Sequence, residues 1–264
     1  MSNSHSEIDV STESNEAFRL VASADVLQRT VALVHSLVDE CRIRFGAEGI
    51  RISAVDPALV ASVDLTVDRS AFEAYDTADC RIGVDLERFR DVVGMASRDQ
   101  LVALTLDPAT RKLEIRIDEL SYTLALLDPE SIRSPHDHSE FELEFAGTVV
   151  TEAGEIDRAI RAADMVSDHL TLRIDEDEEV FYMEADGDTD ELSLELPSSS
   201  LVELTPNDAR SMFSIDYLEP VNRATPSDVE LDLEIGTEAP VAVRYEFADG
   251  AGAVEYLVSP RITT

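Results

Sequence analysis

The sequence contains few residues of several types, and each shortage excludes a class of protein. None of its 264 residues is tryptophan, and its two cysteines, Cys41 and Cys80, stand outside any CxxC or metal-ligand spacing. A disulfide scaffold is therefore excluded, and two buried free thiols in a reducing compartment are expected. No apolar run approaches the roughly 18–20 residues of a membrane helix, so no membrane partner is expected. The polar, acidic N-terminus lacks the apolar segment of a signal peptide.

Basic residues are also scarce, and Lys112 is the single lysine. The chain has 56 acidic and 21 basic residues, which gives a net charge of −35. The carboxylates are spread over every segment, whereas an acidic partner-binding region is usually one concentrated tail. At about 1 M salt the Debye length is roughly 3 Å, so self-repulsion between carboxylates is screened, and hydrated carboxylates keep the surface soluble. We interpret the composition as adaptation to a salt-rich cytoplasm.

Motifs of catalysis and cofactor binding are absent from the sequence. It has no GxGxxG, GxxxxGK[ST], GxSxG or HExxH. His136 and His138 form the only close histidine pair, and no third ligand is implied beside them. The acidic run Asp175–Glu179 lacks the glycine and the position-12 glutamate of an EF-hand, so we interpret it as a solvated turn. His35 and His169 are isolated, and neither a metal site nor a cofactor is expected.

The main positive feature of the sequence is an internal repeat of about 129 residues. Residues 41–56 align with residues 170–186, with one extra residue in the second turn. The apolar frame aligns at Leu27 and Ile156, Arg44 and Arg173, Leu65 and Leu194, and Leu86 and Ile215 (156 − 27 = 129). A repeat of this length indicates two similar domains fused in tandem.

Each half is predicted to contain two units of one helix followed by several strands. In the first half, helical spacing of apolar residues predicts helices over Ser23–Glu40 and Asp85–Arg98, with Ser23 and Asp85 as N-caps. Alternation of apolar and polar residues predicts strands at 42–45, 50–55, 61–67, 101–107, 112–118 and 120–128.

The second half is predicted to follow an extended connector, residues 128–140, which has two prolines and no periodicity. Helices are expected near 154–165 and 216–223, with Pro220 in the first turn of the latter, where proline is tolerated. Strands are expected at 141–145, 170–175, 179–185, 191–197, 209–215, 228–235, 241–247 and 253–259.

Helices that interrupt antiparallel strands, instead of alternating with single strands, are typical of an α+β fold. The predicted organisation is a disordered tail over residues 1–16, a first domain over 17–127, the connector over 128–140 and a second domain over 141–264.

Four segments resemble the archaeal and eukaryotic sliding clamps, the proliferating cell nuclear antigen (PCNA) family. Gly49–Val67 is similar to the family's segment after the first helix, and Glu255–Ile262 to its C-terminal strand and ending. The RATPS run at Arg223–Ser227 and the dipeptide Ala239–Pro240 match as well. The resemblance covers nearly the whole chain from Ala17, and with the composition it points to a clamp from a halophilic archaeon.

The resemblance implies two duplicated DNA-clamp domains and a head-to-tail homotrimeric ring. Such a ring encircles duplex DNA without reading its sequence and acts as a processivity factor, not as an enzyme. It would tether the replicative DNA polymerase, a clamp loader, a flap nuclease and a ligase through PCNA-interacting peptides, in association with the nucleoid of a high-salt cytoplasm. Two alternatives stay open: a subunit of a heteromeric clamp-like ring that acts as an interaction scaffold, and a halophilic enzyme of duplicated fold.

The resemblance also implies three sets of functional residues. The DNA-facing set is Arg29, His35, Arg90, Arg98, Arg158, Arg161 and Arg223. The set for a partner-peptide pocket is Val55, Pro57, Val60, Ile132, Pro240, Leu257, Val258 and Pro260. The set for the subunit interface is Leu120, Tyr122, Leu124, Leu126, Leu192, Leu194 and Leu196.

Two departures from the family pattern accompany these sets. Asp91, Asp216 and Glu219 stand where basic or neutral residues are common, so attraction to DNA is expected to be weak, and weaker still in molar salt. In the connector, Ser134 stands where an aliphatic residue is common.

Overall fold

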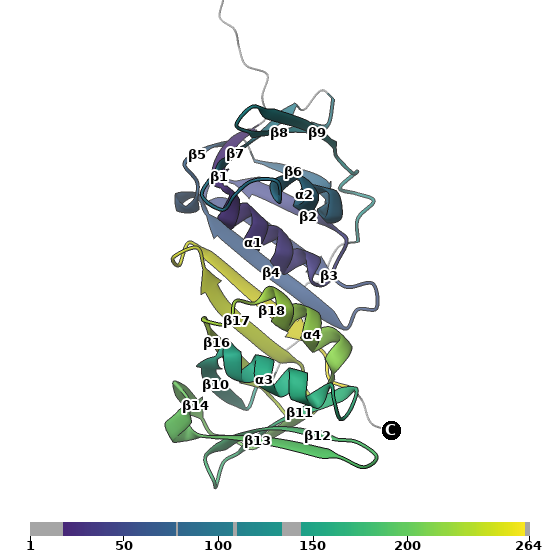
Figure 1. Ribbon diagram of the computed structural model, residues 1–264, viewed down its shortest axis with the longest axis vertical. Coiled ribbons are helices and arrows are strands. Elements are labelled where there is room, and N and C mark those ends of the chain that lie inside the picture. The colour runs from purple at the N-terminus through teal and green to yellow at the C-terminus, as the bar shows by residue number, and fades with distance from the viewer. Residues whose placement is uncertain (1–17, 78, 108–109, 134–143, 262–264) are drawn as a thin grey trace, which may run out of the picture.

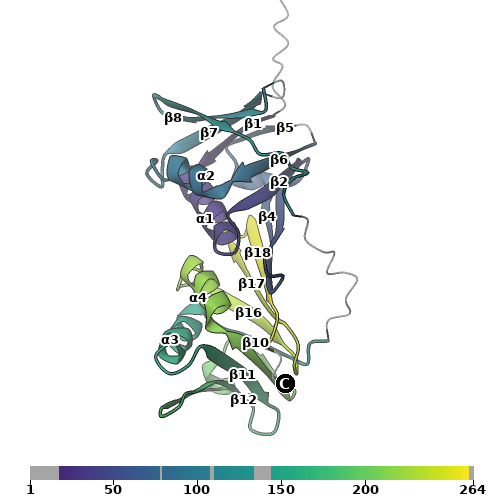
Figure 2. The same ribbon diagram turned by 90° about the vertical axis from the view of Figure 1, so that its right-hand side faces the viewer.

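A computed structural model of the chain describes residues 18–77, 79–107, 110–133 and 144–261 (Figure 1). The predicted N-terminal tail and the pair His136 and His138 lie outside these ranges. The described residues form four α-helices, which lie on one side of the molecule (Figure 2). Among the described helices, none is long and apolar enough to cross a bilayer.

The helices are α1 (Ala24–His35), α2 (Leu86–Val93), α3 (Ala153–Ala163) and α4 (Ile215–Ala224). The strands of the first half are β1 (Phe18–Ser23), β2 (Glu40–Gly46), β3 (Gly49–Val55), β4 (Ala61–Asp68), β5 (Ala74–Thr77), β6 (Cys80–Asp85), β7 (Leu101–Asp107), β8 (Lys112–Ile117) and β9 (Leu120–Ala125). Those of the second half are β10 (Gly147–Glu152), β11 (His169–Asp175), β12 (Val180–Asp186), β13 (Glu191–Pro197), β14 (Glu203–Thr205), β15 (Ala209–Ser214), β16 (Glu230–Ile235), β17 (Val241–Phe247) and β18 (Gly252–Val258).

The elements repeat at the spacing that the sequence predicts. Helix α3 begins 129 residues after α1 (153 − 24), α4 begins 129 after α2 (215 − 86), and β11 begins 129 after β2 (169 − 40). Strands β12, β13 and β18 are displaced by one to three residues more because the turns before β12 and β18 are longer than their equivalents. The duplication is therefore structural, and each feature of one half can be compared with its equivalent in the other.

The sheet order shows how the two halves join. One sheet has the order β5-β1-β7-β8-β9, and another has the order β13-β12-β11-β15. The nine-stranded sheet, β14-β10-β16-β17-β18-β4-β3-β2-β6, consists of the repeat equivalents of both, joined edge to edge. The junction is the antiparallel pair of β18 from the second half and β4 from the first, which we call the seam.

The seam is closed on its helix side by Tyr256. This residue of β18 is fully buried opposite Val63 of β4. Its hydroxyl donates to the Leu33 carbonyl of α1 at 2.8 Å, so a side chain of the second half binds a helix of the first. Burial raises the pKa of Tyr256 well above its usual value, so the hydroxyl stays a donor.

Both predicted N-caps are confirmed, whereas two helices end earlier than predicted. Ser23 accepts from the Val26 amide at 3.3 Å, and Asp85 from the Arg88 amide at 3.0 Å. Helix α1 ends at His35, not at Glu40, because the chain tightens into a turn in which the Ser36 hydroxyl donates to the Leu33 carbonyl.

The second helix, predicted to extend to Arg98, ends at Val93. Gly94 is its C-cap, and the following amides of Met95 and Ala96 bond three residues back in a tighter turn. Pro220 is the sixth residue of α4, not in its first turn as predicted, so the Asp216 carbonyl lacks its usual helical donor.

The sequence-based prediction omits four strands, β1, β5, β6 and β14. It also predicts a strand at 141–145 before the third helix, whereas the strand that leads into α3 is β10, Gly147–Glu152. Residues 141–143 lie outside the described residues. Strand β6 has no visible alternation because Ile82, Gly83 and Val84 are all buried: the segment containing Leu127 and Ile132 covers its second face.

We expect Tyr256→Phe to lower the free energy of unfolding by about 1 kcal/mol, the net contribution of a typical intramolecular hydrogen bond. Tyr245→Phe is the matched control, because the Tyr245 hydroxyl is buried with no hydrogen-bond partner among the described residues, and its removal should be neutral or stabilising. Denaturant titration in concentrated KCl measures both variants. Equal losses would contradict a specific contribution of the bond to Leu33.

We expect Cys41 to resist thiol reagents in the folded protein. Cys41 is buried, and burial followed by the charge of Glu40 raises its pKa to about 12, so little thiolate forms at neutral pH. Cys80 is only half-buried. Mass spectrometry after alkylation should find modification at Cys80 alone until denaturant is added; rapid labelling of Cys41 in the native protein would show that β2 opens.

Candidate functional site

The four helices form one continuous face. Helix α1 packs against α2 and α4, and α3 packs against α4, so the helices of both halves are neighbours across the seam. Six of the seven residues predicted to face DNA lie in these helices, and Arg98 lies in the turn after α2. We call this surface the helix face.

Every predicted DNA-facing residue on the helix face lies beside a carboxylate. Four ion pairs join residues three or four positions apart in the same helix: Arg29 with Asp25 at 2.8 Å, Arg158 with Glu155 at 2.8 Å, Arg161 with Asp157 at 2.6 Å, and Arg223 with Glu219. Arg98 reaches Asp25 of α1 at 3.8 Å, Arg90 reaches Asp91 at 3.5 Å, and His35 Nδ1 lies 4.0 Å from Asp39. The arginine side chains stay between 38% and 78% exposed, so a ligand in solution can reach them.

Polar side chains also tie neighbouring helices together. Gln28, which the sequence places on the polar side of the first helix beside Arg29, turns toward α2 and donates through Nε2 to the carbonyls of Val93 and Ala96, both at 2.9 Å. Its repeat equivalent, Asp157, accepts from Asn222 Nδ2 of α4 at 2.9 Å. The spacing of the helices is therefore set by hydrogen bonds at equivalent positions in both halves.

A groove of about 440 Å³ lies beside the start of the predicted connector. Three residues of the predicted peptide pocket line it: Val55, Pro57 and Ile132. The remaining walls come from Leu37–Arg42, Ser53, Ala54 and Arg133. The sequence-based prediction misses Leu37 and Val38 because it extends the first helix through them.

Two arginines fasten the connector over this groove. Arg42 donates to the Pro129 carbonyl at 2.5 Å and also to the Ile132 carbonyl, and Arg133 donates to the Pro57 carbonyl at 2.8 Å. Ile132 is only 6% exposed, and its Cδ1 atom lies 2.9 Å from the position that a Cβ on Gly83 would take, closer than a real Cβ tolerates. Gly83 is therefore needed for the close approach of the connector to β6.

A buried carboxylate shapes the loop at the end of the groove. Asp56 is 4% exposed and accepts from the amides of Ala58, Val60 and Ala61 at 2.6–2.8 Å. The loop it forms presents Leu59 to solvent with a positive φ of 63°. Asp56 thus has a structural role, which is to fold the loop back onto β4.

The other predicted pocket residues are divided between two sides of the sheet. Leu257 lies opposite Ala242 and Ser62 on the side away from the helices and is 8% exposed, whereas its neighbour Val258 belongs to the core. Three more lie near the end of β18 or before β17 and are partly exposed: Val60, Pro240 and Pro260. Among these five, none lines the 440 Å³ groove.

Six of the seven predicted interface residues lie on two edge strands, and Leu126 directly follows one of them. Strand β9 ends the five-stranded sheet and β13 ends the four-stranded sheet. Leu120 and Tyr122 of β9 are 41% and 38% exposed, while Leu124 is buried in the core. The others are partly buried (Leu126, Leu192, Leu194) or 6% exposed (Leu196).

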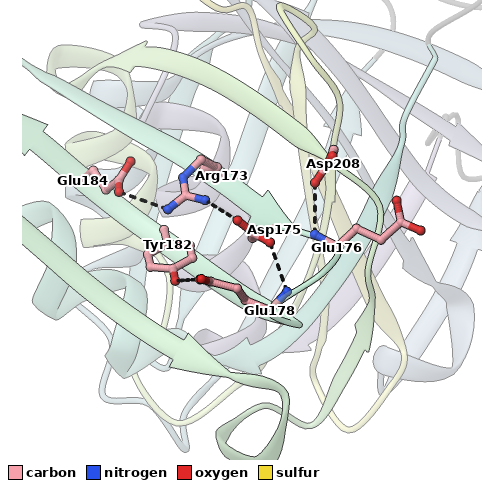
Figure 3. Close-up of polar contacts among 7 residues, drawn as sticks. All are labelled: Arg173, Asp175, Glu176, Glu178, Tyr182, Glu184 and Asp208. Carbon is pink, nitrogen blue, oxygen red and sulfur yellow. Dashed lines mark hydrogen bonds and ion pairs between the residues drawn. The ribbon is translucent and has the colours of Figure 1, made fainter.

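The acidic run Asp175–Glu179 forms the end of β11 and the turn that leads to β12 (Figure 3). Arg173 lies 3.1 Å from Asp175 and 3.3 Å from Glu184, and its guanidinium stacks 3.7 Å from the centre of the Tyr182 ring. Tyr182 donates to the Glu178 carboxylate, which raises the pKa of Tyr182. Within the described ranges, no group of histidine, cysteine, aspartate and glutamate side chains has the geometry of a metal site.

Comparisons with known proteins agree with this geometry. The family model "Proliferating cell nuclear antigen, N-terminal domain" matches residues 17–126. The DNA polymerase sliding clamp of Natronomonas pharaonis is 51% identical over 245 residues, which cover 93% of this chain and 98% of that protein. The clamp of Haloarcula marismortui is 50% identical over the same length and with the same coverage.

A solved structure shows the same fold. This structure is described as the C-terminal region of FEN-1 bound to A. fulgidus PCNA. Its matching chain is 34% identical to this one, with a TM-score of 0.86, and the match covers 94% of this chain and 99% of that chain. The α+β clamp fold is therefore confirmed, and the relatives from halophilic archaea agree with the acidic composition. The expectation of a non-catalytic protein is met by the family. This chain belongs to the PCNA family of DNA polymerase sliding clamps, the processivity factors of DNA replication.

Proposed function

We propose that three copies of this chain close a head-to-tail ring by pairing β9 of one copy with β13 of the next. The seam supports this, because β18 and β4 are the repeat equivalents of β9 and β13 and already pair within one chain. The two exposed edges are therefore a second copy of a junction that the chain makes once internally. Unpaired sheet edges need a partner, and an identical neighbour supplies the matching one.

The seam also predicts the register between copies. Through the strand ladders, Tyr256 corresponds to Tyr122 and Val63 to Leu192. Tyr122 should then lie opposite Leu192 of the neighbouring copy, and Ser121 opposite its Ser193. The exposed Tyr122 would be buried as Tyr256 is. Its hydroxyl would approach the carbonyl of Ala162 in the neighbouring copy, the equivalent of Leu33 (33 + 129 = 162).

In this ring the helix face lines the central hole and meets duplex DNA. The face is continuous across the seam, and the same pairing between copies would continue it across each subunit boundary. In this proposal residues 17–127 and 141–264 are the two clamp domains, and residues 128–140 connect them. The ring then stays on DNA by topology, and tethered enzymes act at high effective concentration.

The groove beside Ile132 is proposed to receive a short peptide with one aliphatic and two aromatic anchors. Its apolar wall of Leu37, Val38 and Val55 fits such anchors, and the fastened connector gives the groove a preformed edge. The structural relative whose description names a bound FEN-1 C-terminal region supports a flap nuclease as one source of the peptide. The polymerase, clamp loader and ligase would use the same groove in turn.

We predict that Ser121→Cys with Ser193→Cys, in a Cys80→Ser background, oxidises to a covalent trimer. Residues directly opposite on antiparallel strands have Cα atoms about 4.5–5.5 Å apart, within the range of a disulfide. The shifted control, Ser121→Cys with Glu195→Cys, should not crosslink, because diagonal neighbours are about 7–8 Å apart. Denaturing electrophoresis measures the product, and light scattering should give about three times 29.0 kDa. A monomer at every KCl concentration would contradict the ring.

We predict that Val55→Asp weakens binding of a PCNA-interacting peptide by about thirtyfold or more, since truncating or charging a central apolar anchor typically costs about 2 kcal/mol. Val202→Asp is the matched control, because Val202 is 57% exposed and does not line the groove. Fluorescence anisotropy of a labelled peptide measures both, with light scattering to verify the ring. Unchanged affinity for Val55→Asp would remove this groove from the peptide site.

A further inference from the structure

We infer that the carboxylates of the helix face compete with DNA phosphates for its arginines, so that the clamp touches DNA weakly while it encircles it. This inference rests on the proposed function, since it takes the helix face as the surface that DNA meets. The competing carboxylates are those of Asp25, Glu155, Asp157 and Glu219. Acidic residues are not ordinarily expected to take part in DNA binding.

Positive and negative charges on the four helices nearly balance. The four helices contain six arginines and seven carboxylates, so they are almost neutral, although the whole chain has a net charge of −35. Negative charge is thus reduced on this face, but not by leaving free cations. Each arginine that could meet a phosphate already has a carboxylate within 4 Å.

The spacing of acid and arginine along each helix favours their ion pairs. In the four pairs that join residues three or four positions apart in one helix, the acid precedes the arginine, which is the orientation that best stabilises a helical ion pair. Asp25 additionally reaches Arg98 from the turn after α2, so one carboxylate neutralises two arginines. A guanidinium binds carboxylate and phosphate with the same planar fork, so both anions compete for the same donors.

The paired arginines of the helix face are accessible to solvent. The side chains of Arg158, Arg161 and Arg223 are 59–74% exposed, so a phosphate can displace their carboxylates. Arg173 on the opposite side of the sheet is only 23% exposed between Asp175 and Glu184 (Figure 3), so its pairs are closed. The pairs of the helix face are therefore open to exchange.

Exchange has a measurable consequence for salt dependence. A phosphate that meets a free arginine releases a counterion from DNA, which gives a slope of about −0.9 in log K against log[salt] for each contact. A phosphate that displaces a carboxylate leaves that carboxylate to take up a cation, so little net ion release remains. The wild-type ring should thus bind duplex DNA weakly and with a shallow salt slope.

The test is the triple variant Asp25→Asn, Glu155→Gln, Glu219→Gln, compared with the wild type on a linear duplex onto which rings can thread. Anisotropy is measured over a KCl series in which light scattering shows the same assembly for both proteins. The variant should bind more tightly, and its slope should steepen by roughly 0.9 for each arginine freed. An unchanged slope would overturn the inference. Glu219→Gln alone, outside the first turn of any helix, repeats the test if the triple variant unfolds.

The matched control is Asp79→Asn, Glu184→Gln, Glu234→Gln, which raises the net charge by the same amount. These carboxylates pair with Arg44, Arg173 and Arg244 at 3.6, 3.3 and 2.7 Å, on side chains that point away from the helices. If bulk charge alone governs affinity, both triple variants will gain equally, and the inference fails.

Alanine variants separate this inference from the proposed function. Arg29→Ala, Arg98→Ala, Arg158→Ala and Arg223→Ala, combined with the amide substitutions, should abolish the gain if it acts through these arginines. If the alanine substitutions weaken DNA binding in the wild type but the amide substitutions change nothing, the helix face remains the DNA surface and only the competition is refuted. If neither set changes binding, both proposals fail.

Discussion

The antiparallel pairing of β18 with β4 is the interaction on which the rest of the structure depends. It joins the two halves into one sheet, aligns α1 with α4, and places the Tyr256 hydroxyl on the Leu33 carbonyl. Glu255 lies directly opposite Asp64 in this pairing, an unfavourable juxtaposition of like charges. Arg244 beside Glu255 and Arg51 beside Asp64 offset the repulsion, and salt screens what is left.

The same junction gives the physical basis of the proposed ring. A duplicated unit that presents one kind of sheet edge at its start and the complementary kind at its end satisfies only one such pair internally, and the other pair is left at β9 and β13. Serines stand at the equivalents of Glu255 and Asp64, so the proposed contact between copies lacks the charge repulsion of the seam. The permanent junction tolerates the charges because it is covalently tethered, whereas an association between chains has no such tether.

In the proposed function, the acidic composition bears directly on how the helix face contacts DNA. A uniformly acidic surface would repel the DNA that a clamp encircles, and a strongly basic one would adhere to it. Short-range ion pairs such as Arg161 with Asp157 make the face nearly neutral without removing its arginines. In the proposed ring, retention by topology makes weak contact sufficient, and this is the regime that concentrated salt would impose in any case.

The sequence by itself determined the repeat, its 129-residue offset, both N-caps and most strands, because these depend on local periodicity and capping chemistry that neighbouring residues express directly. Even β1 could have been found from the alternation of Phe18, Leu20 and Ala22. Tertiary structure alone decided the rest. Strand β6 shows no alternation because the connector covers its outer face. Gln28 points toward the end of α2 and binds it instead of facing solvent. Leu257 and Val258 lie on opposite faces of the sheet. It also decided which carboxylate each arginine meets across helices, as Arg98 meets Asp25. Such choices depend on contacts between residues far apart in the chain, and local pattern carries no information about them.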